Sequence, residues 1–310
     1  IDDNDTWYAK VKDQLALGTD PGFDVACPTN WLVNRMIGLG YLQTLDNANM
    51  PNKVANLAPA YLGDANDPER SISVPYQGII GGIVYNKKMY KEATGKDAPT
   101  SLADVWAPEL KGRVGLISEM RDSVGLTLLS QGIDITSEES LTEDAFNAAV
   151  EFIAAQVSSG QIFNIKGNSY GEDLTNGNII VALAWSGDTT ILNAEVGEDR
   201  FGFVVPDTGS TISSDSFVVP MGSAHKKNAE ALINYYYDPV NAAELAAYVN
   251  YVTPVVGAKE EMLKTDPELA ENPLIFPSEE FLANVHAFRA LTGQEEQRFA
   301  TAWQNVLLGA

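Results

Sequence analysis

The chain has 310 residues, of which 45% are hydrophobic and 20% are charged, a composition typical of a folded globular protein with room for two lobes of roughly 100 to 200 residues each. Its 42 acidic and 20 basic residues give a net charge of −22, which repels phosphate backbones and makes nucleic-acid binding improbable. Because the acids are spread along the chain, the charge alone indicates solubility, and only particular carboxylates can argue for a ligand.

Helix and strand patterns alternate along the chain, which predicts α/β lobes with mainly parallel sheets. In the first half, apolar runs predict buried strands at 23–27, 79–85 and 113–117, and a capping-box pattern predicts a helix that begins at Ser101. The clearest helix spans 141–159, where apolar residues repeat at the helical period between the cap Thr142 and the stop Gly160.

In the second half, further strands are predicted at 179–185, 201–205 and 217–219. Helices follow at 229–237, with Asn228 as a candidate cap, and from Asp238-Pro239 through 247. No repeat or long linker separates the halves, so any division into two lobes must be made by crossing strands. We expect these crossings, and hence a hinge, at 78–85 and 208–220.

The sequence lacks the motifs of several classes of function. The single cysteine, Cys27, is interpreted as a small buried strand residue without a disulfide partner or metal spacing, and no glycine pattern for a nucleotide is present, so we expect no cofactor and no resident metal. No run of 18 apolar residues and no leader before Ile1 occur, so we expect any export signal or lipid anchor to lie outside this sequence. His225 and His286 belong to no catalytic motif and are interpreted as ordinary histidines.

One run leaves an alternative open. Tyr235-Tyr236-Tyr237 could bind ferric iron as tyrosinates, as adjacent tyrosines do in some transport proteins. Packing within an amphipathic helix is the favoured interpretation.

A series of segments spread along the chain is distinctive in its order and spacing. They are Phe23–Trp31, Ser73–Tyr76, Gly82–Asn86, Ser101–Gly112, Leu116–Asp122, Ala184–Asp188, Ser214–Pro220 and Tyr251–Pro254. Taken in order, these segments resemble the spermidine/putrescine-binding proteins of bacterial ABC importers, and the resemblance covers essentially the whole chain.

The resemblance implies the fold and the biological role. It implies a class II periplasmic-binding-protein fold with two α/β lobes, crossing hinge strands and a ligand cleft, which we divide into 1–81 plus 216–262 and 82–215 plus 263–310. It implies an exported, periplasmic or extracellular protein without enzymatic activity. We expect it to act as a monomer that delivers a polyamine to a membrane permease powered by a separate ATPase.

A polyamine requires carboxylates for its ammonium groups and aromatic faces for its methylenes. Glu119 and Asp122 follow a predicted strand three residues apart, where a strand-to-helix turn places both carboxylates on one face, and they match the family's pair for one amine end. The alternative is that Arg121 pairs with one of them on the surface. Trp185 ends a strand and matches a stacking ring, with a core role as the alternative, and Asp188 matches an acid used by some putrescine-binding members.

The remaining candidate residues come from the other segments. Asp215 matches the family's hinge aspartate, with a turn or cap aspartate as the alternative. Thr29 and Trp31 match residues that line the rim of the first lobe, and Tyr251 matches a tyrosine before Thr-Pro. Ser213 stands where the best-known member has a second tryptophan.

The sequence also departs from the family at its start, because Ile1 begins after the family's first strand. Two alternatives stay open: a binding protein of the same fold for another amine, an opine-like compound or ferric iron, and, from a different class, a glycosidase using Glu119 and Asp122 as acid and base. The second alternative requires carboxyl groups about 5 to 9.5 Å apart around a sugar.

Overall fold

The computed structural model describes residues 3–62, 64 and 66–309, which form two compact units. Unit 1 comprises Asp3–Ile79 and Ser213–Ser278, and unit 2 comprises Ile80–Ile212 and the chain from Glu279 onward. The chain therefore passes from one unit to the other within strand β1 (Ser73–Asn86), within strand β6 (Ser210–Val218) and before helix α14 (Glu279–Leu282). The expected crossing stretch 78–85 lies within β1, and the stretch 208–220 contains β6, whereas the third crossing was not expected.

The division expected from the sequence differs from these units mainly in residues 263–278, which it placed in the second lobe. The structure places them in unit 1, where helices α12 (Ala258–Thr265) and α13 (Pro267–Ala270) pack together and α12 packs on α11 (Pro239–Val249). The physical reason is burial, since Met262, Ala270 and Ile275 belong to the apolar core of unit 1.

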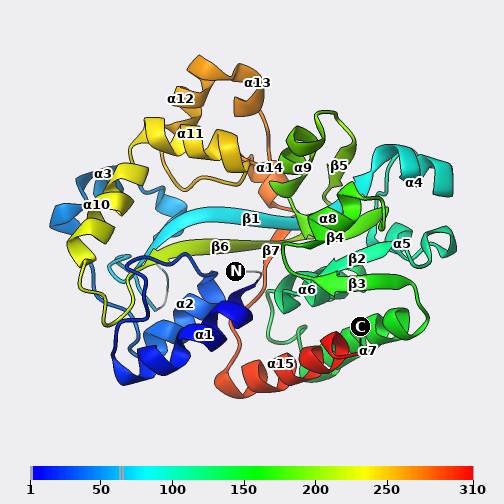
Figure 1. Cartoon of the computed structure of the whole chain (residues 1–310), viewed down its shortest axis with the longest axis horizontal. Coiled ribbons are helices and arrows are strands. Elements are labelled where there is room, and N and C mark those ends of the chain that lie inside the picture. Colours follow the sequence, from blue (N-terminus) through cyan, green and yellow to red (C-terminus); the bar gives the residue numbers. More distant parts are fainter. Residues whose placement is uncertain (1–2, 63, 65, 310) are drawn as a thin grey trace. The chain divides into compact units, whose positions relative to one another are not determined.

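Unit 1 contains two apolar cores. One lies between helices α1 (Asn4–Leu17) and α2 (Asn30–Gly38) and includes Trp7 and Leu32. The other gathers under α10 (Lys226–Tyr236), α11 and α12, which Figure 1 shows in yellow and orange. The shorter helices of this unit are η1 (Asn47–Asn49), α3 (Pro51–Asn56) and η2 (Pro59–Tyr61).

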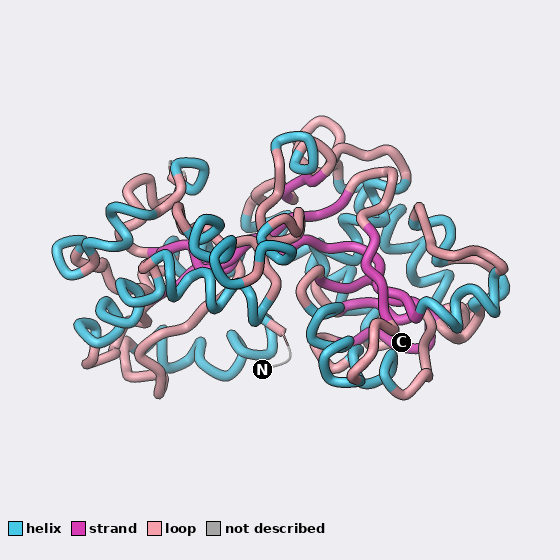
Figure 2. The backbone as a smooth tube through the Cα atoms, turned by 90° about the horizontal axis from the view of Figure 1, so that it is seen from above, coloured by secondary structure: helices cyan, strands magenta, loops and turns pink. Residues whose placement is uncertain are grey.

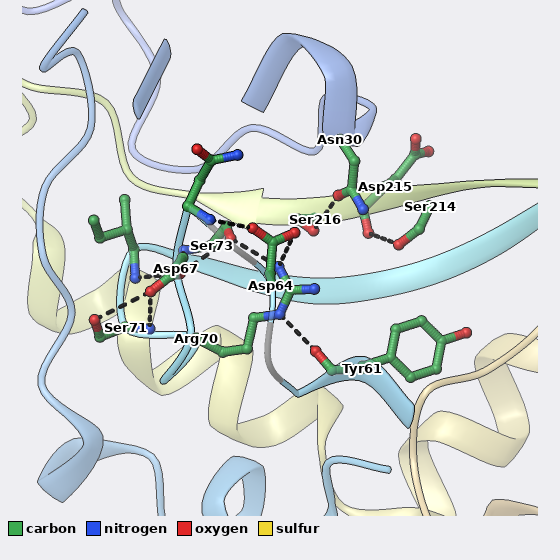
Figure 3. A network of polar contacts seen from close by, with 12 residues as sticks. Asn30, Tyr61, Asp64, Asp67, Arg70, Ser71, Ser73, Ser214, Asp215 and Ser216 are labelled. Atoms are coloured by element: carbon green, nitrogen blue, oxygen red, sulfur yellow. Dashed lines mark hydrogen bonds and ion pairs between the residues drawn. The ribbon is translucent and has the colours of Figure 1, made fainter. Parts of the chain in front are cut away.

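A buried polar network fixes the start of β1 in unit 1 (Figure 3). Asp67 accepts hydrogen bonds from the backbone N–H groups of Ser71, Ile72 and Ser73 at 2.7–2.9 Å, and these bonds lower the pKa of Asp67 against the opposing effect of desolvation by burial. Arg70 donates to the Tyr61 carbonyl at 2.7 Å. The segment that precedes β1 is thereby held by side chains instead of by a sheet.

Unit 2 is built on a mixed sheet with the strand order β3-β2-β4-β1-β6-β7, with β5 paired to β1. Strand β1 runs antiparallel to β4 and β5, whereas β2 is parallel to β3 and β4, and β6 is parallel to β7. The expectation of a mainly parallel sheet is thus only partly correct, because β1 enters the sheet as a crossing strand instead of through a helical connection. The other strands are β2 (Val114–Ile117), β3 (Ile162–Lys166), β4 (Val181–Trp185), β5 (Phe201–Val204) and β7 (Val285–Ala287).

Helices cover the sheet of unit 2 on both sides, as Figure 2 shows in cyan around the magenta strands. Helix α15 packs along α7, and α7 contacts α6. The helices of this unit are α4 (Lys87–Thr94), α5 (Leu102–Val105), η3 (Pro108–Leu110), α6 (Met120–Ser130), α7 (Glu143–Ser158), α8 (Tyr170–Thr175), α9 (Asp188–Val196), α14 and α15 (Gly293–Leu307). In the described part of the chain, every helix is too short or too polar to cross a lipid bilayer.

Most of the predicted elements are confirmed. Thr142 caps α7 by accepting from the Ala145 N–H, and Asp238 caps α11 by accepting from the Val240 N–H. The predicted strand at 23–27 is wrong, since only Ala26 pairs with a neighbour, Val218. The ring of Phe23 instead packs on Trp7, and Cys27 is exposed, contrary to the expected buried position.

Candidate functional site

In unit 2, the turn from β2 into α6 positions Glu119 and Asp122. Glu119 is the N-cap residue and Asp122 lies in the first turn, where the partial positive charge of the helix end favours a carboxylate. The Ser123 hydroxyl donates to the Ile117 carbonyl at 2.6 Å and so ties the helix to the end of the strand. Glu119 is half-buried, whereas the Asp122 side chain is almost completely buried.

Asp122 is held at both carboxylate oxygens. The Trp185 indole Nε1–H donates to Oδ2 at 3.0 Å, and the Thr211 hydroxyl donates to Oδ1 at 2.8 Å. Burial raises the pKa of Asp122 above its ordinary value of 3.8, while these two hydrogen bonds and the nearby Arg121 charge oppose that rise. Asp122 is therefore a rigid, buried anchor.

The neighbouring residues complete this arrangement. Trp185 ends β4, is only 9% exposed and meets the Tyr170 ring edge-on with centroids 6.2 Å apart. Arg121, considered as a surface partner for one of the two acids, donates to Glu296 on α15. Gly81 on β1 has no room for a side chain, because a Cβ there would lie 2.2 Å from the Thr211 hydroxyl oxygen.

Asp188 is linked to the same group through Tyr170. Asp188 is the first residue of α9 and accepts a hydrogen bond from the Tyr170 hydroxyl, whose oxygen also accepts the backbone N–H of Trp185 at 3.4 Å. The structure thus brings Asp122, Trp185 and Asp188 into one connected set. Reasoning from sequence missed Thr211 and Tyr170, because a single hydroxyl belongs to no motif, although Thr211 lies in the predicted crossing stretch.

In unit 1, Thr29 and Asp215 lie side by side. They form an antiparallel bridge between the start of α2 and β6, and the Thr29 hydroxyl donates to Asp215 Oδ1 at 2.8 Å. The side-chain amide of Asn4 on α1 donates to the Thr29 hydroxyl oxygen at 3.0 Å and accepts the Thr29 backbone N–H at 3.1 Å. Asp215 lies within a strand, so it is neither a turn nor a cap aspartate.

Figure 3 shows Asp215 on β6 with its neighbours Ser214 and Ser216 beside Asn30. The Ser216 hydroxyl donates to Asn30 Oδ1 at 2.9 Å, which gives a second tie between the strand and the start of α2. Desolvation and the Asp215 charge raise the pKa of the Cys27 thiol to about 12, although the residue as a whole is exposed. The Asp215 carboxylate therefore makes its surroundings electrically negative.

The two aromatic candidates of unit 1 are both half-buried. Trp31 lies on α2, and the Arg35 guanidinium stands 5.4 Å from the centre of its ring. A ring face of Trp31 therefore already interacts with a cation. Tyr251 precedes Val252, whose backbone exchanges hydrogen bonds of 2.8 and 3.0 Å with Gly78 on β1.

Two residues of the tyrosine run 235–237, Tyr236 and Tyr237, belong to the core of unit 1, whereas Tyr235 is exposed. The Tyr237 hydroxyl donates to the Pro75 carbonyl at 2.6 Å and that of Tyr236 donates to the Tyr76 carbonyl, while burial raises the pKa of both hydroxyls. These hydroxyls are thus held protonated, whereas ferric iron requires tyrosinates. Across residues 3–62, 64 and 66–309, no group of three or more His, Cys, Asp or Glu side chains is arranged to hold a metal ion.

Comparisons with known proteins give one consistent result. A family model described as bacterial extracellular solute-binding protein matches residues 2–277. The chain is 28% identical, over 92% of its length and 74% of the relative, to spermidine/putrescine-binding periplasmic protein 1 of Haemophilus influenzae. It is 27% identical, over 93% of its length and 79% of the relative, to the putrescine-binding periplasmic protein PotF of Escherichia coli.

Solved structures share the fold. The spermidine/putrescine ABC transporter substrate-binding protein PotD of Streptococcus pneumoniae superposes with a TM-score of 0.77 at 24% identity, covering 100% of this chain and 89% of that one. AgtB of A. tumefaciens, solved with agropinic acid, gives 0.73 at 19% identity, covering 97% and 86%. The expected fold class is confirmed, and these relatives are binding proteins, not enzymes. The chain belongs to the family of bacterial extracellular solute-binding proteins.

Proposed function

We propose that this protein is the polyamine-binding component of a bacterial ABC importer, and that its ligand is a cation of the putrescine or spermidine type. The observation that carries the proposal is that each unit combines carboxylates with an indole ring. In unit 2, Asp122 accepts a hydrogen bond from Trp185, and Asp188 is linked to Trp185 through the Tyr170 hydroxyl. In unit 1, Asp215 accepts a hydrogen bond from Thr29, which lies two residues before Trp31. The names of several relatives support the same class of ligand.

The chemistry of these sets suits an alkyl ammonium ion. A charge-assisted hydrogen bond contributes about 1.5 to 3 kcal/mol and a cation–π contact about 0.5 to 2 kcal/mol, so three or four contacts are enough for micromolar affinity after the entropic cost of binding. A net charge of −22 also attracts cations over longer distances. The proposed ligand contacts are Thr29, Trp31, Glu119, Asp122, Trp185, Asp188, Asp215 and Tyr251.

These residues have different proposed roles. Asp215 uses one carboxylate oxygen for the Thr29 hydroxyl, and a carboxylate has about four acceptor positions, so it has the capacity to bind an ammonium group as well. Asp122 already accepts a donor on each oxygen and is almost completely buried, so we assign it chiefly to holding Trp185. Glu119 and Asp188 are half-buried and are proposed to meet an amine of the ligand in unit 2.

The partner and the location follow from the same proposal. We propose that the protein acts as a monomer in the periplasm or outside the cell and passes its ligand to a membrane permease. The family description, which names an extracellular solute-binding protein, supports this location.

Isothermal titration calorimetry with putrescine and spermidine tests the proposal. We expect binding at millimolar concentration or below, and a loss of about 30-fold or more in Asp215→Ala, because removing one partner of a close charge pair costs about 2 kcal/mol or more. Glu268→Ala is the matched control, since this exposed acid of α13 lies in the same unit and its loss changes the net charge equally.

Two results would count against the assignment. If neither polyamine binds the intact protein at millimolar concentration, the ligand class is wrong, and titrations with other amines and with ferric citrate become the next measurement. If Asp215→Ala loses less than about tenfold while binding is otherwise intact, Asp215 is not a ligand contact.

A further inference from the structure

A series of hydrogen bonds links the two acids Asp122 and Asp188 of unit 2 through Trp185. It runs from the Thr211 hydroxyl to the Asp122 carboxylate and from there to the indole N–H of Trp185. It continues from the backbone N–H of Trp185 to the Tyr170 hydroxyl, and from that hydroxyl to Asp188. Asp122 and Asp188 are therefore not independent acids, since both are attached to the same tryptophan.

The direction of the bonds at Tyr170 is fixed by chemistry. A backbone N–H only donates, so the Tyr170 oxygen accepts from Trp185, and its single proton is directed to the Asp188 carboxylate. The side chain of Tyr170 is fully buried at the start of α8, and its ring packs on that of Trp185. The hydroxyl thus has little freedom to reorient.

We propose that Tyr170 is a positioning residue for ligand binding, which holds Asp188 in one orientation and keeps it ionised. The inference rests on the proposed function, because it assigns to Asp188 a role toward an ammonium group. A hydrogen bond to a carboxylate favours the charged form, and a fixed acceptor loses less entropy when the cation binds. Tyr170 acts on the ligand through Asp188.

The alternative is that Tyr170 only fills the core of unit 2 with its ring. Tyr170→Phe separates the two roles, because it keeps the ring and removes the hydroxyl. Tyr90→Phe is the matched control: Tyr90 is equally buried in the same unit, and among the residues that the structure describes its hydroxyl donates to no carboxylate.

Calorimetry with putrescine and spermidine provides the first measurement. We expect Tyr170→Phe to weaken binding about tenfold, as for the loss of one hydrogen bond to a charged group, and Tyr90→Phe to change it less than about twofold. In the Asp188→Asn background, Tyr170→Phe should have less than about a twofold effect, because the carboxylate through which it acts is gone. Equal effects of Tyr170→Phe in both backgrounds would overturn the proposal.

A second measurement needs no ligand and keeps this proposal separate from the proposed function. In carboxyl-labelled protein, nuclear magnetic resonance follows the titration of Asp188, assigned by the signal missing in Asp188→Asn. Removing the Tyr170 hydroxyl should move this titration to higher pH, since the charged form loses its donor. An unchanged titration refutes the positioning role. If the wild-type protein binds neither polyamine, the proposed function fails, and the titration still decides the role of Tyr170.

Discussion

The hydrogen bond from Thr211 to Asp122 offers the sharpest test of the structure. Thr211→Val preserves the shape of the side chain and removes the donor that lies 2.8 Å from Asp122 Oδ1. Both residues are buried, at 2% and 6% exposure, so water is poorly placed to replace the lost donor. A hydrogen bond to a charged group is worth about 1.5 to 3 kcal/mol, so we expect the free energy of unfolding to fall by about 2 kcal/mol at neutral pH.

The size of this loss should depend on pH in a defined direction. Burial raises the pKa of Asp122, so the native state takes up a proton on Asp122 at a higher pH than the unfolded state does. The stability contributed by protonated Asp122 is therefore present at low pH and is lost as the pH rises through the folded pKa. Since Thr211 stabilises the ionised form, the difference between variant and wild type should be full above the folded pKa and should shrink below it.

Urea unfolding followed by tryptophan fluorescence, from pH 8.5 to pH 4, measures this difference. Thr127→Val on α6 is the control, because Thr127 is also buried but donates to the neutral carbonyl of Ser123 at 2.8 Å. We expect its cost to be about 1 kcal/mol and independent of pH. The reasoning fails if Thr211→Val costs no more than Thr127→Val, or if its cost stays constant over the whole range.

Two further predictions concern Gly81, which lies beside Thr211, and Cys27, whose thiol feels the charge of Asp215. Gly81→Ala should lower the free energy of unfolding by about 1 to 3 kcal/mol and weaken polyamine binding, because the new Cβ would lie 2.2 Å from the Thr211 hydroxyl oxygen. Urea unfolding and calorimetry measure the two effects. Gly293→Ala is the control, because a Cβ at Gly293 meets no neighbour within 4 Å. The thiol of Cys27 has a pKa raised to about 12 by desolvation and by the Asp215 charge, so it should react slowly with iodoacetamide at pH 8 and much faster above pH 10. Fast alkylation at pH 8 would contradict that pKa.

The candidate sites show which kind of residue is visible in a sequence. Asp122, Trp185 and Asp215 could be named because they lie in segments that resemble the spermidine/putrescine-binding family, and Asp122 also follows a predicted strand while Trp185 ends one. Thr211 and Tyr170 could not, because hydroxyl groups are common and their role here depends on partners 89 and 18 residues away along the chain. The strand predicted at 23–27 is wrong for a related reason, because the ring of Phe23 packs on Trp7 of α1, a contact that local sequence does not reveal.

The sequence by itself determined the alternation of helices and strands and the capped helix α7, because these depend on local periodicity and on caps within a few residues. Only the tertiary structure decided that 263–278 belongs to unit 1, that Asp122 is buried between two donors, and that Asp188 shares Tyr170 with Trp185. These features depend on which buried surfaces and donors meet across long stretches of chain. Packing and desolvation decide such pairings, and neither is encoded in any short segment.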